Sequence, residues 1–178
     1  MRKILTLVLL LSALSLAQAM STVNACHKTA SLTYEQWPNG IVEVGEEVQW
    51  RIDIVLALGL PDVTPGTVLE DCVVTDNLAA ELEIDQIILV THGYADYYTT
   101  GRSDKAHLTW HVGNLGYMEW ATLSFYVSTD INPAGRHEYT SPGTYYLNSG
   151  PTLKYHIDGT QYSLEMNNVM VTVYPRVS

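Results

Sequence analysis

Two histidines four positions apart, His107 and His111, are the residues in this sequence best suited to metal or proton chemistry. An imidazole nitrogen can bind a metal ion or exchange a proton near neutral pH. The histidines alternate with Leu108, Trp110 and Val112, which is the period of a strand with one face in the core. A zinc site needs a third protein ligand and usually a fourth, and the local spacing supplies neither. We interpret both histidines as solvent-facing strand residues, with a metal site as the alternative.

Acidic residues offer a second kind of metal site, since calcium prefers carboxylate oxygens. Asp62, Glu70, Asp71 and Asp76 lie near the ends of expected loops. No D-x-D-x-D-G calcium loop is present, so scattered surface acids are the simpler interpretation. We predict no cofactor, with calcium as the alternative.

Known catalytic motifs do not occur in the sequence. It contains no G-x-S-x-G nucleophile elbow, no H-E-x-x-H and no glycine-rich phosphate loop. A glycosidase would need two carboxylates that face each other across a cleft, and linear spacing cannot define such a pair. We therefore predict that the protein is not an enzyme.

Tyrosines provide a candidate binding surface. Tyr94, Tyr97 and Tyr98 lie in residues 92–102, HGYADYYTTGR, which we predict to be a loop, and a second tyrosine-rich stretch follows at 137–146. Tyrosines among small polar residues make rigid, amphipathic contacts with a glycan or a protein. The alternative is that they cover the edges of a β-sandwich.

The first 19 residues have the composition of a secretory signal peptide. Arg2 and Lys3 precede a short apolar run that ends in Ala17-Gln18-Ala19, an A-x-A cleavage pattern. We expect a mature chain from Met20, placed outside the cell or on its surface, with cleavage before Cys26 in a lipoprotein as the alternative. The apolar run is short for a membrane span and no second one follows, so we predict no span.

The charge of the chain is strongly negative. Nine basic residues stand against 19 acidic ones, a net charge of −10, and removal of Arg2 and Lys3 makes it −12. An acidic surface without a basic cluster repels nucleic acid and anionic lipid. Neither is therefore predicted as a partner.

Two cysteines, Cys26 and Cys72, remain after the signal peptide. Outside the cytoplasm an even count favours a disulfide. A bridge between Cys26 and Cys72 within one chain, a bridge between chains, and a buried thiol at Cys72 all remain open.

Alternation with a period of two dominates the rest of the chain. In 48–56, VQWRIDIVL, every second residue is apolar, as in a strand with one buried face. Turn residues separate such runs, and Asp158-Gly159 is the pair preferred in a type I′ hairpin. We predict an all-β immunoglobulin-like sandwich of seven to nine antiparallel strands over residues 29–178, after an N-terminal arm at 20–28. The other predicted strands are 30–37, 68–76, 84–91, 108–112, 123–127, 144–156 and 169–173.

Three segments, in order, resemble the pattern of a known repeat. Residues 42–54, VEVGEEVQWRIDI, are similar to its opening strands, and 72–78, CVVTDNL, to its v-x-v-x-D-x-L strand. Residues 108–127, LTWHVGNLGYMEWATLSFYV, are similar to its W-x-v-G-x-L segment. Later glycine and asparagine positions of the repeat correspond to Gly143, Asn148 and Asn167-Asn168. The family is the Ig-like repeat domain of unknown function found in bacterial and archaeal surface and envelope proteins and adhesins.

This resemblance implies an Ig-like sandwich at the cell surface with a structural or adhesive role, and it supplies no catalytic residues. The chain departs from the pattern at NLAAEL and LGLPDV, where the repeat has L-P-x-G-L and N-x-G. Independently of the family, we expect Asp76 to accept hydrogen bonds from the backbone N–H of Leu78 or Ala79.

We therefore predict a secreted structural subunit that assembles with itself, or with other surface proteins or glycans. A filament would form if the N-terminal segment MSTVNACHKTASL, residues 20–32, were lent as a strand to a neighbour, where Cys26 would meet Cys72 of that neighbour. The alternative for the arm is that 29–36 is the first strand of the chain's own sheet. The alternative function is a monomeric adhesion module that binds through the tyrosine-rich loops.

Overall fold

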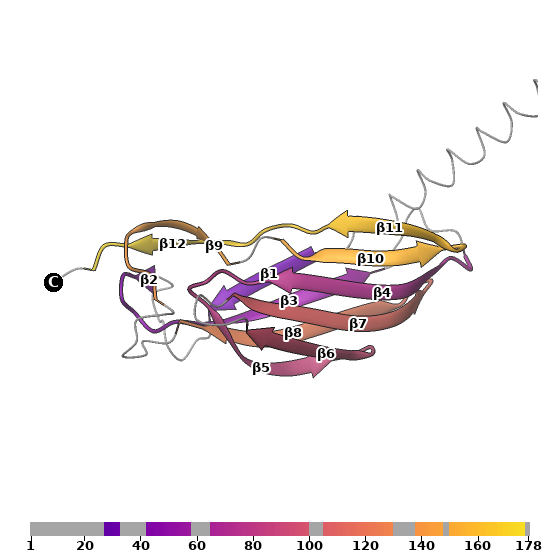
Figure 1. The fold of residues 1–178 in the computed structure, drawn as a ribbon, viewed down its shortest axis with the longest axis horizontal. Helices are drawn as coiled ribbons and strands as arrows, with labels where there is room; N and C mark the ends of the chain where they lie inside the picture. The colour runs from indigo at the N-terminus through magenta and orange to yellow at the C-terminus, as the bar shows by residue number, and fades with distance from the viewer. Residues whose placement is uncertain are drawn as a thin grey trace, which may run out of the picture.

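The computed structural model describes residues 27–32, 42–57, 65–99, 105–129, 138–147 and 150–176, the first range by its backbone alone. All regular structure in these ranges is β-strand, which confirms the predicted all-β sandwich (Figure 1). There are more strands than the predicted seven to nine, because residues 94–99 form a strand where a loop is predicted, 144–156 forms two strands, 160–165 adds another and Val42 begins a short one. The strands are β1 (His27–Leu32), β2 (Val42–Glu43), β3 (Gln49–Ala57), β4 (Val68–Asn77), β5 (Glu83–Val90), β6 (Tyr94–Thr99), β7 (Ala106–Gly116), β8 (Trp120–Ser128), β9 (Gly143–Tyr146), β10 (Thr152–Ile157), β11 (Thr160–Glu165) and β12 (Met170–Tyr174).

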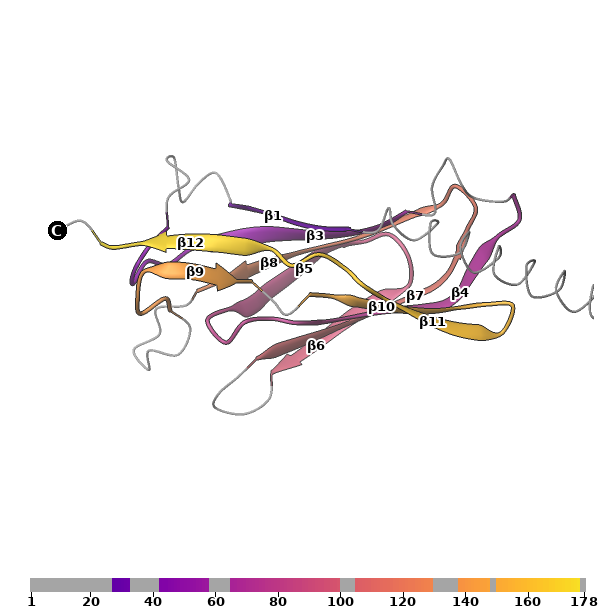
Figure 2. The ribbon, with the colours of Figure 1, turned by 90° about the horizontal axis from the view of Figure 1, so that it is seen from above.

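Two sheets face each other across the core. The four-stranded sheet has the order β1-β3-β8-β5 and the five-stranded sheet has the order β11-β10-β4-β7-β6. Figure 2 shows these sheets as two layers, with β9 and β12 beyond one end. A third sheet, β2-β12-β9, contains the one parallel pair among the described strands, β2 with β12.

The alternating residues of the long strands fill the space between the layers. In β3 Trp50, Ile52 and Ile54 are buried, as the pattern of 48–56 predicts. On the facing sheet, Leu108 and Trp110 of β7 are equally buried. Full burial of a large aliphatic or aromatic side chain stabilises a fold by about 1.5–3 kcal/mol. These paired rows therefore supply much of the free energy that holds the two sheets together.

The C-terminal strands form one long hairpin that is irregular in its middle. β10 pairs with β11 and β9 with β12, in registers that differ by one residue. The turn at its tip, Asp158-Gly159, has φ of 49° and 74°. Positive φ at both central residues is the mark of a type I′ turn, so this sequence prediction is confirmed.

A tight corner at residues 91–93 carries the chain from one sheet to the other. It joins β5, an edge of the four-stranded sheet, to β6, an edge of the five-stranded sheet. The indole N–H of the buried Trp110 donates to the carbonyl of His92 over 2.8 Å. Gly93 has φ of 66°, and a Cβ there would lie 1.7 Å from the carbonyl oxygen of His111. The core tryptophan and the missing side chain together place β6 against β7.

The N-terminal strand belongs to the chain's own sheet. β1 pairs antiparallel with β3 from His27 opposite Val55 to Leu32 opposite Trp50. The strand predicted at 30–37 thus begins earlier, and the last two residues of the predicted arm at 20–28 lie in it. Residues 1–26 lie outside the described ranges, so the signal peptide and the rest of the arm stay predictions.

Candidate functional site

Two tyrosine–histidine stacks lie on the outer face of the five-stranded sheet, with the pair of Asp96 and Thr109 between them. Tyr94 of β6 is opposite His111 of β7, with ring centroids 4.7 Å apart and planes inclined by 23°. Tyr98 is opposite His107, with corresponding values of 5.1 Å and 24°. The tyrosines are 61% and 57% exposed. We call these four residues the Tyr–His face.

The second stack continues onto a third strand. The Nδ1 of His107 lies 2.5 Å from Oδ1 of Asn77 on β4, the geometry of a ring N–H that donates to the amide oxygen. The row Asn77–His107–Tyr98 therefore presents an exposed aromatic ring beside a polar imidazole. This arrangement suits the binding of a partner.

The structure does not bring the three predicted binding tyrosines onto one surface. They lie on strand β6, so the prediction of a loop over 92–102 is wrong for residues 94–99. Tyr97 is opposite the buried Leu108, which places it on the other face of β6 from Tyr94 and Tyr98. It is still 42% exposed, because β6 lies at the edge of the sheet.

The predicted metal candidates do not gather either. His107 and His111 share a face, but four residues of strand separate them by about 13 Å, too far for both to bind one ion. Asp71 lies at a bulge of β4 with φ of 52°, and its Oδ2 is 3.8 Å from Nδ1 of His156. Within the described ranges no three His, Cys, Asp or Glu side chains cluster as metal ligands would.

Asp76 occupies a different environment from the one predicted. It is buried on the inner face of β4, on the same side as Val74. The N–H of Leu78 donates to the carbonyl of Ala106 over 2.9 Å, and that of Ala79 to the carbonyl of Leu147 over 3.1 Å. The predicted capping of these N–H groups by Asp76 is therefore wrong. A calcium ligand at Asp62 would lie outside the described residues.

Cys72 is fully buried on the inner face of β4, on the same side as Val74. Its thiol donates to the carbonyl of Leu69 with a sulfur–oxygen distance of 3.6 Å. Cys26 lies outside the described residues. The disulfide between these two cysteines therefore stays a prediction, within or between chains.

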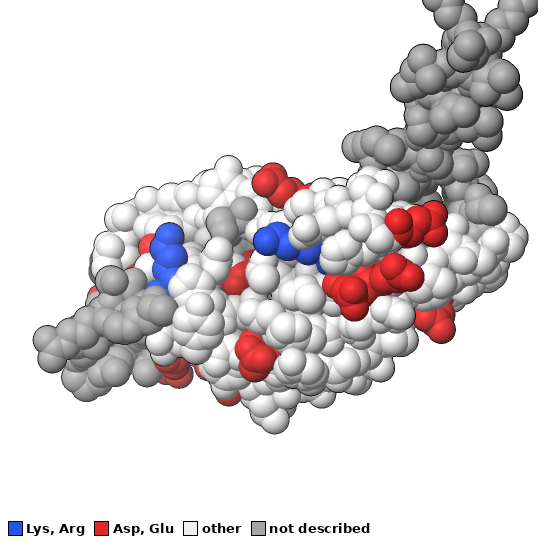
Figure 3. All heavy atoms as spheres, turned by 45° about the vertical axis from the view of Figure 1, so that its right-hand side comes forward, with Lys and Arg blue, Asp and Glu red and all other residues white. Residues whose placement is uncertain are grey.

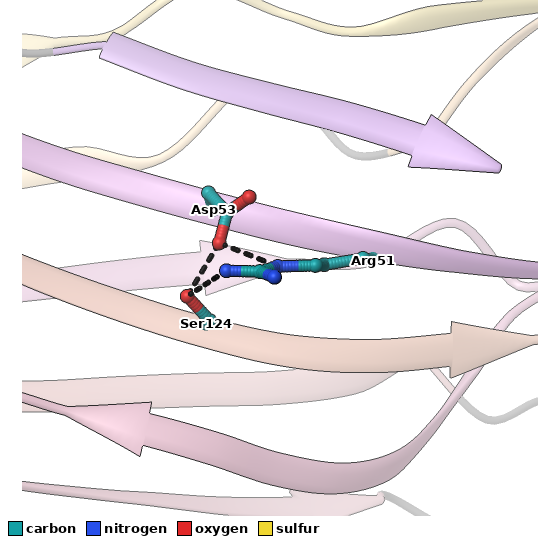
Figure 4. Close-up of polar contacts among 3 residues, drawn as sticks. All are labelled: Arg51, Asp53 and Ser124. Carbon is teal, nitrogen blue, oxygen red and sulfur yellow. Dashed lines mark hydrogen bonds and ion pairs between the residues drawn. The ribbon is translucent and has the colours of Figure 1, made fainter. Parts of the chain in front are cut away.

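A polar cluster on the outer face of the four-stranded sheet joins Arg51, Asp53 and Ser124 (Figure 4). The Nε of Arg51 lies 3.1 Å from Oδ1 of Asp53, and its Nη2 donates to Oγ of Ser124 over 3.4 Å. The Ser124 hydroxyl donates to the same Asp53 oxygen. A catalytic serine is usually activated by a histidine, and this cluster contains none; the Ser124 side chain is also fully buried. The three groups satisfy one another, so we interpret the cluster as a link between β3 and β8.

The stretch 137–146 contributes to the core as well as to the surface. The ring of Tyr139 is fully buried, edge-on to Trp50 at 6.1 Å and tilted against Tyr145 at 4.6 Å. Burial raises the pKa of the Tyr139 phenol well above its ordinary value, and the nearby Glu81 carboxylate adds to the increase. Its hydroxyl has no hydrogen-bond partner among the described residues. Tyr146, by contrast, is exposed on β9.

Charge is dispersed over the face of the molecule drawn in Figure 3. Acidic side chains are spread across that face, and the basic side chains drawn there do not form a patch. This agrees with the acidic composition of the chain. The described ranges contain no helix that could cross a membrane.

Comparison with known proteins gives limited similarity. No family model matches the chain. An uncharacterized protein of Archaeoglobus fulgidus is 34% identical over 83 residues, which are 46% of this chain and 29% of that protein. This chain therefore spans less than a third of that relative's length. Membership of the Ig-like surface-protein repeat family therefore stays a prediction.

Similar solved structures have low identity. The full-length major pilin SpaD from Corynebacterium diphtheriae has a TM-score of 0.48 at 12% identity, over 83% of this chain and 34% of the pilin. A cohesin module from a Clostridium perfringens family 33 glycoside hydrolase has a TM-score of 0.41 at 13% identity, over 87% of this chain and 99% of the module. A Nocardia farcinica protein with an immunoglobulin-like fold has a TM-score of 0.39 at 16% identity, over 83% of this chain and 97% of that protein. At these scores the similarities carry no functional argument.

Proposed function

We propose that the chain is a non-enzymatic structural subunit of an extracellular or cell-envelope assembly. The observation that carries this proposal is that the polar cluster on one sheet is internally hydrogen-bonded, whereas an edge strand of the other sheet exposes large side chains. The polar cluster around Ser124 is satisfied within the sheet, whereas the edge strand β6 carries exposed tyrosines and has β7 as its one neighbour among the described strands. Such a surface is suited to association rather than to catalysis.

The physical basis is the hydrogen bonding of an edge strand. One side of an edge strand has N–H and C=O groups without a partner strand, and another chain can pair with them. β5, at the edge of the four-stranded sheet, has two register shifts against β8. Bulges of this kind discourage further pairing. β6 has no such shift against β7. The two edges thus differ in their capacity to pair, and among the described strands nothing pairs with the outer side of β6.

Light scattering with size-exclusion chromatography on the chain from Met20, with and without reductant, tests this proposal. We expect species larger than a monomer. A variant without residues 20–26 keeps β1 whole, because that strand begins at His27. Loss of large species in this variant would support strand exchange by the arm, and loss in reductant would support disulfides between chains. A monomer under every condition would contradict the structural proposal.

A second candidate function is recognition of a glycan or a protein by the Tyr–His face. One face of each tyrosine ring is covered by a histidine, and the other face is available for contact with a ligand. A ligand that touches both tyrosines has to span about 13 Å, so a monosaccharide is too small. Binding to an oligosaccharide array that is lost in the Tyr94→Ala/Tyr98→Ala double variant would favour this function. Equal binding by that variant and the wild type would exclude it.

A further inference from the structure

We propose that β6 pairs antiparallel with β6 of a second copy of this chain, about a two-fold axis at Tyr97. The two five-stranded sheets would then join into one continuous sheet. This inference rests on the proposed structural function and names the partner and the surface. It differs from strand exchange because each chain keeps all of its own strands.

Compared with β5 and β11, β6 offers a better combination of regularity and apolar surface. Its pairing with β7 runs without a shift from Tyr94 to Thr99. β5, at the edge of the other sheet, has two shifts. β11, the opposite edge of the same sheet, is also regular, but its Tyr162 and Leu164 pack against the core. Three large exposed side chains lie on β6.

The charge on β6 selects the register of the pair. A two-fold axis perpendicular to the sheet places the outer faces of both copies on the same side of the joined sheet. Each residue on the outer face of β6 is therefore opposite an outer-face residue of the second copy. Two registers pair all but one residue of the strand, one centred on Asp96 and one on Tyr97. The first places two carboxylates directly opposite each other, which is unfavourable. The second places Asp96 opposite Tyr98 of the second copy.

The favoured register also matches the side chains on both faces. On the outer face, the Tyr98 hydroxyl can donate to the Asp96 carboxylate of the second copy. The two Tyr98 rings are diagonal neighbours, which extends the row of Asn77, His107 and Tyr98 across the axis. On the other face, Tyr97 is opposite Tyr97 of the second copy. Asp96 is the one charged side chain in the paired strands, and it meets a hydroxyl.

Cysteine cross-linking tests the register. In the proposed pair Tyr97→Cys places two thiols directly opposite each other, in a hydrogen-bonded pair whose Cα atoms would lie about 5.5 Å apart, within the range that a disulfide spans. Asp96→Cys places each thiol opposite Tyr98 instead. Under mild oxidation we expect a covalent dimer with Tyr97→Cys well above the wild-type background, which includes Cys26 and Cys72. Cross-linking of Asp96→Cys in preference to Tyr97→Cys would overturn the inference.

Sedimentation equilibrium tests the surface itself. Tyr97→Lys places two positive charges opposite each other and should raise the dissociation constant of the dimer by roughly tenfold or more. Tyr174→Lys is a matched control, because Tyr174 is 51% exposed on β12, which has a neighbour on each side. The control should change the constant little, and circular dichroism checks that both variants fold.

The outcomes separate this inference from the broader proposal. If the wild type assembles but Tyr97→Lys leaves its dissociation constant unchanged, the structural function stands and the β6 interface is wrong. A wild-type chain that stays monomeric at every concentration contradicts both. Equal weakening by Tyr97→Lys and Tyr174→Lys would also overturn the β6 interface, because the effect would then not depend on the edge.

Discussion

Replacement of Gly93 by alanine should be among the most damaging single-methyl changes in this protein. Gly93 lies in the corner that leads into β6, with φ of 66°. An alanine Cβ would lie 1.7 Å from the carbonyl oxygen of His111, whereas real Cβ contacts essentially never fall below 3.0 Å. Since the obstacle is backbone, no side chain can rotate away. The corner or β7 therefore has to move.

Two separate costs contribute to the expected loss of stability. A left-handed backbone conformation costs a non-glycine residue about 1–2 kcal/mol. Movement of the corner also breaks the hydrogen bond from the Trp110 indole to the His92 carbonyl, and an unsatisfied buried donor costs about 1–3 kcal/mol. Together the expected loss in the free energy of unfolding is about 2–5 kcal/mol.

Gly45→Ala provides a matched control. Gly45 has φ of 71°, close to that of Gly93, but a Cβ there meets nothing within 4 Å. It therefore bears the conformational cost alone, about 1–2 kcal/mol. Urea unfolding followed by circular dichroism would measure both variants. If Gly93→Ala and Gly45→Ala lose the same free energy, the close approach to His111 has no energetic importance and the account of the corner is wrong.

Three further changes test the core and the polar cluster. Trp110→Phe keeps an aromatic ring but removes the donor to His92, and it should lower the free energy of unfolding in urea by about 1–3 kcal/mol. Burial raises the pKa of Tyr139, so the unfolded chain releases a proton above pH 10 that the native chain keeps, and stability falls as the pH rises. Between pH 9 and about 11, the free energy of unfolding of Tyr139→Phe should fall less with rising pH than that of the wild type. An equal fall in both proteins would contradict this. Ser124→Ala removes the hydroxyl that donates to Asp53 and should cost about 1 kcal/mol, whereas a loss of several kcal/mol would refute its role as a simple link.

The sequence predicts the sandwich well where one face of a strand is buried. β3 and β7 alternate apolar and polar residues because one side of each strand meets the opposite sheet. The same alternation places His107 and His111 on the outer side of Trp110, where the structure has them. The type I′ turn at Asp158-Gly159 was predictable because few residue pairs accept positive φ at both positions.

Prediction fails where that alternation is absent. Both sides of β6 are largely exposed, so YADYYT has no apolar period, and its glycine and small polar neighbours suggest a loop. The strand is specified by tertiary contacts, through Trp110 and the close passage of Gly93. The prediction for Asp76 is wrong for a different reason. Its polarity suggests an exposed loop end, but with Cys72 and Val74 it occupies every second position of the strand, and this alternation correctly places its carboxylate on the inner face.

The corner at 91–93 links the stability of the core to the surface proposed for assembly. Trp110 is fully buried between the sheets, yet its indole nitrogen holds the carbonyl directly before Gly93, and β6 begins one residue later. A change in the corner should therefore alter the edge strand without touching Tyr97. If the β6 interface exists, Gly93→Ala should weaken dimer formation as Tyr97→Lys does, and Gly45→Ala should not. A Gly93→Ala protein that loses stability but dimerises like the wild type would show that assembly uses another surface.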